Sequence, residues 1–218
     1  MKTIIFDLDG TLIDSLTDIA LCANKVLEEL KHPTHSIDDY KNFVGDGAKI
    51  LMQNCMPKGL DESDINLGLE KFKKLYDRNI YGNTQPYDGI YEMLRSLQDE
   101  NYSLNVLSNK PHKFTVQYIE KLFREFKFDE VHGQKEHIPK KPDPSGAINI
   151  SKALNIELKD ILYIGDTGTD MKTAVNAGMI PIGVLWGFRD KDELLEHGAK
   201  HLVENPQELY NLIKNYSS

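Results

Sequence analysis

An apolar run followed at once by two carboxylates opens this chain, in the sequence Ile4-Ile5-Phe6-Asp7-Leu8-Asp9-Gly10. Such a short apolar run is typical of a strand that is buried on both faces of a parallel sheet. Side chains alternate along a strand, so we expect Asp7 and Asp9 to point the same way while Leu8 points to the opposite side. Both acids would then lie in the crevice beyond the carboxyl end of the strand, where open α/β sheets bind their ligands.

Two carboxylates held this close together are costly to ionise in the same place. They therefore favour either a bound metal ion or two different proton affinities. At this point a solvated strand end or an acidic turn remains an alternative. A calcium-binding loop fits less well, because Gly10 follows the second acid directly and the later ligand spacing is absent.

Length and charge limit the kind of protein and the kind of partner. A chain of 218 residues can form one large domain or two unequal ones, and 40% hydrophobic with 28% charged residues is ordinary for a globular protein. The net charge of −8 argues against nucleic acid or an anionic membrane as the main partner. An anionic substrate would need local positive charge or a bound cation.

The cysteines and the first apolar run bear on the compartment. Only Cys22 and Cys55 occur, and their spacing is not that of a metal site, which favours a reducing compartment. Asp7 interrupts the first apolar run too early for a signal peptide or a membrane span. We expect a soluble, cytoplasmic protein.

The pattern of helices and strands changes along the chain. Residues 15–80 contain four helical patterns and no good strand, and the last of these patterns predicts a buried face made by Leu67, Leu69, Phe72, Leu75 and Tyr76. Residues 81–89 have the composition of a linker, and beyond them helices alternate with strands. Strands are expected at Lys2–Phe6, Ser103–Leu107, Glu130–His132, Ile161–Ile164, Ile180–Leu185 and His201–Val203.

Alternating strands and helices imply a parallel sheet with right-handed crossovers. We therefore predict an α/β fold, with a Rossmann-like parallel sheet core flanked by helices. Residues 1–14 and 81–218 would form this core, and residues 15–80 a small inserted α-helical cap domain. We expect the cap to move about residues 14–15 and 80–88, because a lid that excludes water must reopen for product release.

Polar side chains follow several of the predicted strands and loops. They are Asp7 and Asp9, the run Ser108-Asn109-Lys110, Lys141, and the pair Asp166 and Asp170. Polar clusters with unrelated roles would be expected at both edges of the sheet. Four clusters on one edge predict a single site.

In this order the clusters resemble motifs one to four of the haloacid dehalogenase superfamily, and the resemblance spans nearly the whole chain. The segments are Asp7-Leu8-Asp9-Gly10-Thr11, Ser108-Asn109-Lys110, Lys141-Pro142 and Gly165 to Asp170. The helical block at 15–80 is similar to the small cap inserted after the first motif. The run Asp9 to Ser15 and the loop Val44-Gly45-Asp46-Gly47-Ala48 look most like the phosphoglycolate phosphatase-like branch.

The resemblance implies roles for the two leading acids. Asp7 would be the nucleophile that attacks phosphorus and forms an aspartyl-phosphate. Asp9 would protonate the leaving oxygen and later activate water, a contribution of typically ~10²–10⁴-fold. Dehalogenases of the family lack an acid at the position of Asp9, so its presence argues for phosphoryl transfer.

The resemblance also implies a Mg²⁺ cofactor and a phosphate site. Mg²⁺ would be held by Asp7, the backbone carbonyl of Asp9 and Asp166, with Asp170 as an outer or water-mediated partner. A carboxylate that merely stabilises the first turn of a helix is the alternative for Asp170. Phosphate would be bound by Thr11, Ser108, Asn109 and Lys141. The family motif has a lysine directly before a proline, which favours Lys141 as the phosphate-binding lysine. Lys110 and Lys140 are the other candidates for this role.

We therefore predict a magnesium-dependent phosphatase acting on a small phosphorylated metabolite, with 2-phosphoglycolate as the first substrate to test. A sugar phosphomutase resembling β-phosphoglucomutase, a pyrophosphatase and a non-catalytic regulatory binder remain alternatives. Lys49 is a candidate for contacting a substrate carboxylate, with solvent as the alternative. The expected assembly is a monomer or a dimer.

Overall fold

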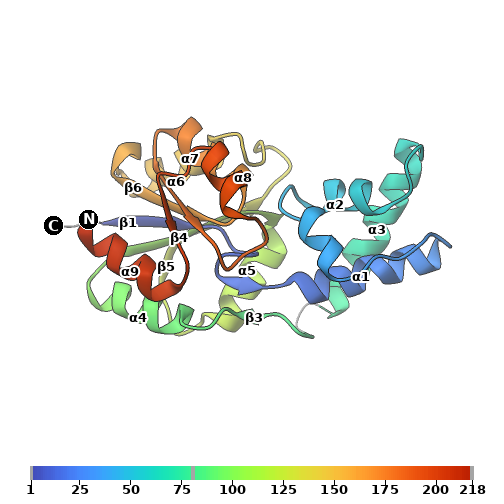
Figure 1. The fold of residues 1–218 in the computed structure, drawn as a ribbon, viewed down its shortest axis with the longest axis horizontal. Coiled ribbons are helices and arrows are strands. Elements are labelled where there is room, and N and C mark those ends of the chain that lie inside the picture. The colour runs from blue at the N-terminus through green and yellow to red at the C-terminus, as the bar shows by residue number, and fades with distance from the viewer. Residues whose placement is uncertain (1, 80–81, 217–218) are drawn as a thin grey trace.

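A six-stranded parallel sheet forms the centre of the molecule in the computed structural model, which describes residues 2–79 and 82–216. The strands lie in the order β5-β4-β1-β6-β7-β8 (Figure 1). Their bounds are β1 Thr3–Phe6, β4 Ser103–Pro111, β5 Phe128–Gln134, β6 Ile161–Gly165, β7 Ile180–Val184 and β8 His201–Val203. This arrangement confirms the predicted α/β fold, and each predicted strand is present, β4 extending further than the pattern indicates.

The opening strand β1 lies in the middle of this sheet. Its four residues are buried, and it pairs in parallel with β4 on one side and β6 on the other. Phe6 is level with Val106 of β4 and with Ile164 of β6. The loops that leave the carboxyl ends of the three central strands therefore start side by side.

Helices cover both faces of the sheet, because alternate side chains of each strand point to opposite sides. Ile5 packs into a core with residues of α6 and α7, whereas Ile4 and Phe6 pack into the larger core shared with α4, α5 and α9. The helices are α4 Ile90–Asp99, α5 His112–Leu122, α6 Ser145–Leu154, α7 Gly168–Ala177, α8 Lys191–Glu196 and α9 Pro206–Asn215. The pattern gives no prediction for the short helix α8.

The segment between β2 and β3 is helical, as predicted, and lies at one end of the sheet (Figure 1). It contains α1 Leu16–Glu29, the 3₁₀ helix Asp38–Asn42, α2 Ala48–Cys55 and α3 Glu62–Asn79. Ile65, Phe72 and Tyr76 form the buried face of α3. The prediction for Leu67 is wrong, because this side chain points away from that face and is 47% exposed.

The helical segment is joined to the sheet at a small two-stranded sheet. There β2 Ile13–Asp14 pairs antiparallel with β3 Gln85–Pro86, so the expected linker contains a short strand. Close by, the buried carboxylate of Asp18 accepts hydrogen bonds from the backbone and side chains of Asn83 and Thr84 at 2.6–3.0 Å. The predicted boundary at residues 80 and 81 lies outside the described residues.

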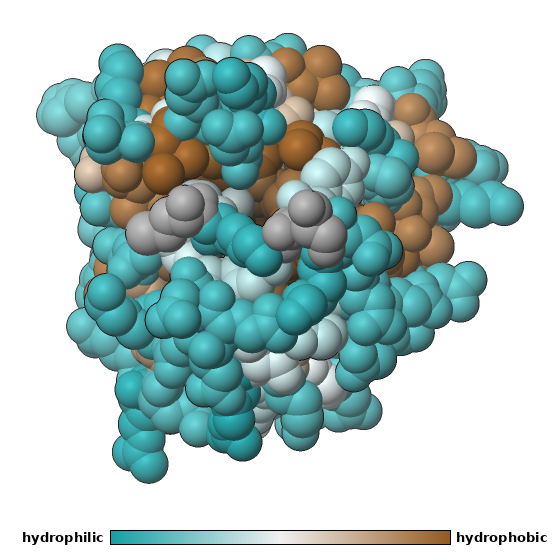
Figure 2. Space-filling view, turned by 90° about the vertical axis from the view of Figure 1, so that its left-hand side faces the viewer, coloured by the Kyte–Doolittle hydropathy of each residue, from teal (hydrophilic) through white to brown (hydrophobic). Residues whose placement is uncertain are grey.

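The end of the molecule where the described chain begins and ends carries both hydrophilic and hydrophobic side chains (Figure 2). In the described part of the chain, no helix is long and apolar enough to cross a membrane. The predicted polar clusters follow the carboxyl ends of the strands, at the opposite edge of the sheet. The site is therefore built where the sheet meets the helical segment.

Candidate active site

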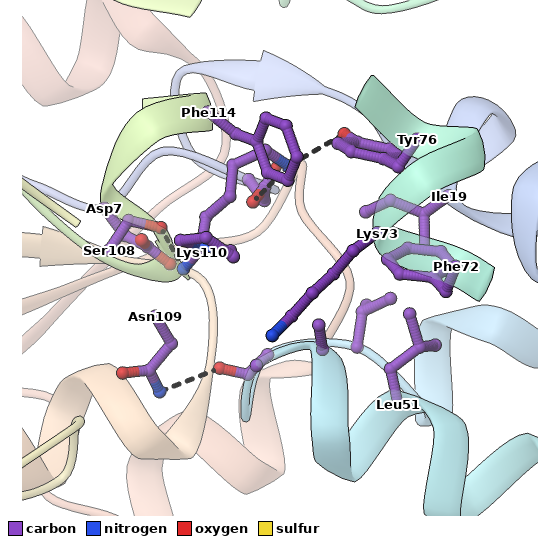
Figure 3. A pocket seen from close by; sticks show the side chains of 16 residues that line it. Asp7, Ile19, Leu51, Phe72, Lys73, Tyr76, Ser108, Asn109, Lys110 and Phe114 are labelled. Atoms are coloured by element: carbon purple, nitrogen blue, oxygen red, sulfur yellow. Dashed lines mark hydrogen bonds and ion pairs between the residues drawn. The ribbon is translucent and has the colours of Figure 1, made fainter. Parts of the chain in front are cut away.

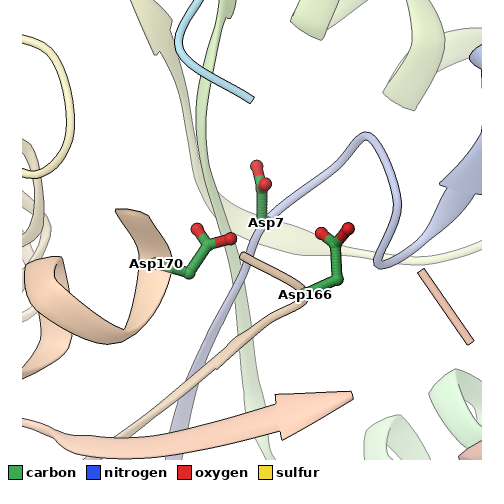
Figure 4. A group of neighbouring side chains, drawn as sticks. All are labelled: Asp7, Asp166 and Asp170. Carbon is green, nitrogen blue, oxygen red and sulfur yellow. The ribbon is translucent and has the colours of Figure 1, made fainter. Parts of the chain in front are cut away.

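Three buried aspartates from separate parts of the sequence meet at the carboxyl edge of the sheet (Figure 4). Asp7 follows β1, Asp166 follows β6, and Asp170 lies in the first turn of α7. One carboxylate oxygen from each lies within 4.8 Å of those of the other two. The prediction that these acids gather at one edge of the sheet is confirmed.

Lys141 provides the positive charge beside these acids. Its ammonium lies 2.9 Å from Asp7 Oδ1 and 2.7 Å from Asp170 Oδ1, and the side chain is only 3% exposed. Burial on its own would lower the pKa of Lys141, but the charges of Asp170 and Asp7 outweigh it and raise this pKa well above its usual value. Lys140 is exposed and donates instead to the carbonyl of Asp46 at 2.8 Å.

With all three carboxylates ionised and one ammonium beside them, two negative charges would be uncompensated in a buried site. Burial and the charge of Asp170 raise the pKa of Asp7 to about 7 despite the nearby Lys141. Burial and the charges of Asp170 and Asp7 also raise the pKa of Asp166 well above its usual value. Oxygen ligands with this net charge fit a hard divalent cation, because the cation would replace the missing positive charge.

Asp166 and Asp170 differ in how their oxygens are engaged. Asp166 Oδ1 accepts from the Thr11 hydroxyl at 3.1 Å, and Oδ2 accepts from the backbone of Phe188 at 2.9 Å. Asp170 Oδ1 accepts from Lys141, while its Oδ2 accepts from the backbone and hydroxyl of Thr167 in a capping box. Asp170 therefore holds Lys141 and begins α7, in addition to any contact with a cation.

Two glycines allow the backbone to pass directly against Asp166. Gly10 has a φ of +86°, and a Cβ placed on it would lie 2.2 Å from Asp166 Oδ2. A Cβ on Gly187 would lie 2.3 Å from the Asp166 Cβ. The sequence marks Gly10 as a sharp turn, but it carries no signal that Gly187 contacts an acid far away in the chain.

Asp9 lies beside the acid cluster and is held by two groups. Its Oδ1 accepts from the Ser15 hydroxyl at 2.5 Å and from Lys110 Nζ at 2.9 Å. Lys110 also donates to the Tyr76 hydroxyl at 2.8 Å, and Tyr76 belongs to α3. Lys110 thus pairs with Asp9 rather than Asp7, and sequence reasoning missed both Ser15 and the polar contact of Tyr76.

The remaining predicted phosphate ligands differ in whether they line the pocket and in whether their polar atoms already have partners. Ser108 lines the pocket beside Asp7 (Figure 3), whereas the hydroxyl of Thr11 is bonded to Asp166. Asn109 also lines the pocket, but its amide donates to the carbonyls of Gly45 and Lys141 at 3.1 Å, and its oxygen accepts from Lys141 N at 2.8 Å. Asn109 therefore fixes the backbone of Lys141 and joins it to the helical segment.

The pocket lies between the carboxyl edge of the sheet and the helical segment (Figure 3). Its cavity is about 60 Å³. One wall carries Asp7, Asp9 and Ser108. The other wall comes from the helical segment and includes Leu51, Phe72, Lys73 and Tyr76.

The chain matches known proteins over most of its length. A family model described as "Haloacid dehalogenase-like hydrolase" matches residues 4–184. A phosphoglycolate phosphatase of Pseudomonas syringae pv. tomato is 31% identical, covering 94% of this chain and 74% of that protein. A phosphoglycolate phosphatase of Aquifex aeolicus is 30% identical, covering 99% and 98% of the two chains.

A crystal structure of a predicted phosphatase from Clostridium acetobutylicum superposes with a TM-score of 0.87, at 28% identity and with 98% of each chain covered. The fold, the buried acid cluster and the matched family model agree with one another. The chain therefore belongs to the haloacid dehalogenase-like hydrolase family, as its four ordered motifs predict.

Proposed function

We propose that this chain is a magnesium-dependent phosphatase that hydrolyses a small phosphomonoester through an aspartyl-phosphate on Asp7. The observation that carries this proposal is the position of Asp7, which lines the pocket and lies directly beside Lys141 and Asp166. The curated relatives given above are phosphoglycolate phosphatases, so 2-phosphoglycolate is the first substrate to test.

In the first step, one oxygen of Asp7 attacks phosphorus and the bond from phosphorus to the ester oxygen breaks. Asp7 Oδ1 accepts from the Leu8 amide at 2.7 Å and from Lys141, and these contacts fix the carboxylate. Within the described residues Asp7 Oδ2 has no hydrogen-bond partner, which makes it the candidate attacking atom. Ser108, beside Asp7 in the pocket, would donate to an oxygen of the transferred phosphoryl group.

Asp9 would give a proton to the leaving oxygen and later accept a proton from the attacking water. Water then attacks phosphorus, so the bond to Asp7 breaks and inorganic phosphate leaves. Ser15 and Lys110 hold Asp9 at the pocket wall. Asp9 must exchange these bonds to reach the ester oxygen, and an entering phosphate beside Lys110 offers that ammonium an alternative partner.

Asp7, the backbone carbonyl of Asp9 and Asp166 would hold Mg²⁺, with Asp170 contributing through water. When bound, Mg²⁺ would neutralise the charge between Asp7 and the phosphate and orient the phosphate for in-line displacement. The uncompensated charge of the buried acids supports this assignment. The hydrogen bonds from Lys141 and Thr167 to both oxygens of Asp170 support its outer position.

Residues 15–80 would act as a cap over a core made of residues 1–14 and 81–218. Polar contacts join the two parts around the pocket. Asp46 accepts from the Thr169 hydroxyl at 2.8 Å, and Arg189 donates to the Val44 carbonyl at 2.8 Å. Such contacts hold the two parts together over the pocket, and they would have to break for the proposed cap to open and release product.

The test is phosphate release from purified protein with Mg²⁺ and with EDTA. The substrate panel contains 2-phosphoglycolate, sugar phosphates, nucleotides and pyrophosphate, and the Asp7→Asn variant is the matched control. We expect magnesium-dependent release by the wild type and a loss of at least about 10³-fold in the variant. Equal hydrolysis by both proteins would overturn the assignment of Asp7, and no hydrolysis by the wild type would favour a mutase or a non-catalytic binder.

A further inference from the structure

Lys73 is a charged residue on an otherwise mostly apolar wall of the pocket. It lies on α3, one residue after the buried Phe72 and in the same helix as Tyr76. Its side chain crosses the pocket, with the ammonium directed to the side on which Asn109 lies (Figure 3). Val44, Ala48, Leu51 and Phe72 supply the apolar part of this wall.

The other lysines near the pocket already have partners. Lys110 is paired with Asp9, and Lys141 is paired with Asp7 and Asp170. Lys49, the cation that the sequence suggests for a substrate carboxylate, does not line the pocket and is paired with Glu62 at 2.7 Å. No carboxylate among residues 2–79 and 82–216 forms an ion pair with Lys73, so its charge remains available to a ligand.

An unpaired ammonium beside apolar side chains selects for negative charge. A substrate anion would gain a charge-assisted hydrogen bond with this exposed ammonium, next to the apolar side chains of Phe72 and Leu51. Asp7 and Ser108 line the same pocket as Lys73, so a phosphate at Asp7 and a second anionic group at Lys73 can belong to one molecule. A carboxylate joined to the phosphate by a short carbon chain fits these conditions.

We propose that Lys73 binds the carboxylate of the substrate and thereby selects phosphate esters of short hydroxy acids. This inference rests on the proposed phosphatase function and assigns the charged part of its specificity to one residue of the helical segment. Lys73 contacts the end of the substrate that does not react, so its loss weakens binding more than it slows the chemical step.

The test compares kcat/KM for two substrates of similar size, 2-phosphoglycolate and 2-hydroxyethyl phosphate, which lacks the carboxylate. Lys73→Met should lower kcat/KM for 2-phosphoglycolate by about 10- to 100-fold, mainly through KM, and leave 2-hydroxyethyl phosphate nearly unchanged. Lys74→Met is the matched control, because Lys74 is the next residue of α3 and is exposed like Lys73, but does not line the pocket. This control should keep the wild-type preference.

A charge reversal makes the test independent of any general loss of activity. Lys73→Glu should disfavour 2-phosphoglycolate and raise the relative kcat/KM for 2-aminoethyl phosphate, whose ammonium would meet the new carboxylate. Equal losses on all three substrates in both Lys73 variants would overturn the proposal, and so would an unchanged preference for 2-phosphoglycolate. Failure of the wild type to hydrolyse any phosphomonoester would instead refute the proposed function itself.

Discussion

At the scale of single residues, Gly10 decides whether Asp166 can occupy its place in the acid cluster. A side chain at Gly10 would collide with the Asp166 carboxylate and would also require a φ of +86°. We expect Gly10→Ala to lose most of its activity and at least about 2 kcal/mol of unfolding free energy, through backbone strain and the collision. Denaturant unfolding and phosphate release measure the two effects.

Gly59 provides a control for the backbone strain alone. Its φ of +90° is close to that of Gly10, but a Cβ there would meet nothing within 4 Å. Gly59→Ala should therefore lose about 1 kcal/mol and keep its activity. If the two variants behaved alike, the close approach of Gly10 to Asp166 would have no functional importance.

The raised pKa of Asp7 predicts how stability depends on pH when no divalent cation is bound. With a pKa of about 7 in the folded state and 3.8 in the unfolded chain, Asp7 binds a proton more tightly when folded. The stability gained from this tighter proton binding is complete below pH 3.8. It is lost as the pH rises towards 7, at up to about 1.4 kcal/mol of unfolding free energy per pH unit.

Thermal unfolding in EDTA at pH 5 and pH 8 checks this sign. The wild type should be less stable at pH 8, and Asp7→Asn should show a smaller difference between the two pH values. Added Mg²⁺ should stabilise the wild type more at pH 8, because the cation binds ionised carboxylates. The same pH dependence in both proteins would show that Asp7 is not the group responsible.

At the scale of secondary-structure elements, Asp18 joins α1 to the chain segment that leads into β3. This buried carboxylate accepts hydrogen bonds from four donor groups of Asn83 and Thr84, and these bonds lower its pKa despite its burial. Asp18→Ala should cost about 3 kcal/mol, because it leaves buried donors without an acceptor. Glu28→Ala, an exposed acid of the same helix, should cost less than about 0.5 kcal/mol in the same unfolding experiment. Equal costs would refute a special role for Asp18.

Most of the longer elements follow from the sequence because their side-chain periodicity reflects burial directly. The strand His201–Val203 agrees with prediction to the residue, and the strand Ile161–Gly165 differs by one residue. The pairing of β2 with β3 was beyond prediction, since two-residue strands show no periodicity and their partners lie far apart in the chain. The prediction for Leu67 was wrong because Leu67 lies five residues before Phe72, and residues share a helix face when they are three or four apart.

The candidate site also has a part that the sequence predicts and a part that it does not. The sequence predicts one cluster of Asp7, Asp166, Asp170 and Lys141, because parallel strands end at a common edge. The hydrogen bonds of Thr11 and Asn109, and the place of Lys73 in the pocket, could not. They depend on which distant segments touch, and a single sequence does not record those contacts.

At the scale of the whole molecule, the pocket has walls from both the sheet and the helical segment, so the proposed cap motion would move one wall relative to the other. Asp46 and Thr169 are bonded across this boundary, which makes Asp46→Cys with Thr169→Cys a suitable pair for a reversible cross-link. We expect the oxidised double variant to lose most of its turnover and to recover it on reduction. Phosphate release before and after reduction measures this.

The single variants Asp46→Cys and Thr169→Cys, oxidised in the same way, control for the substitutions. The native Cys22 and Cys55 are buried and should not compete for the cross-link. Mass spectrometry confirms that the disulfide has formed. Undiminished turnover in the fully cross-linked protein would contradict the proposed motion of the cap.

The central claim is that Asp7 carries the phosphoryl group during the reaction. Mixing the enzyme with Mg²⁺ and 2-phosphoglycolate, quenching rapidly in acid and mapping the peptides by mass spectrometry tests it most directly. We predict that the peptide containing Asp7 gains the mass of one phosphoryl group in the wild type, and that Asp7→Asn shows no gain. Active turnover without any phosphorylated peptide, or with the phosphoryl group on another residue, would contradict the account.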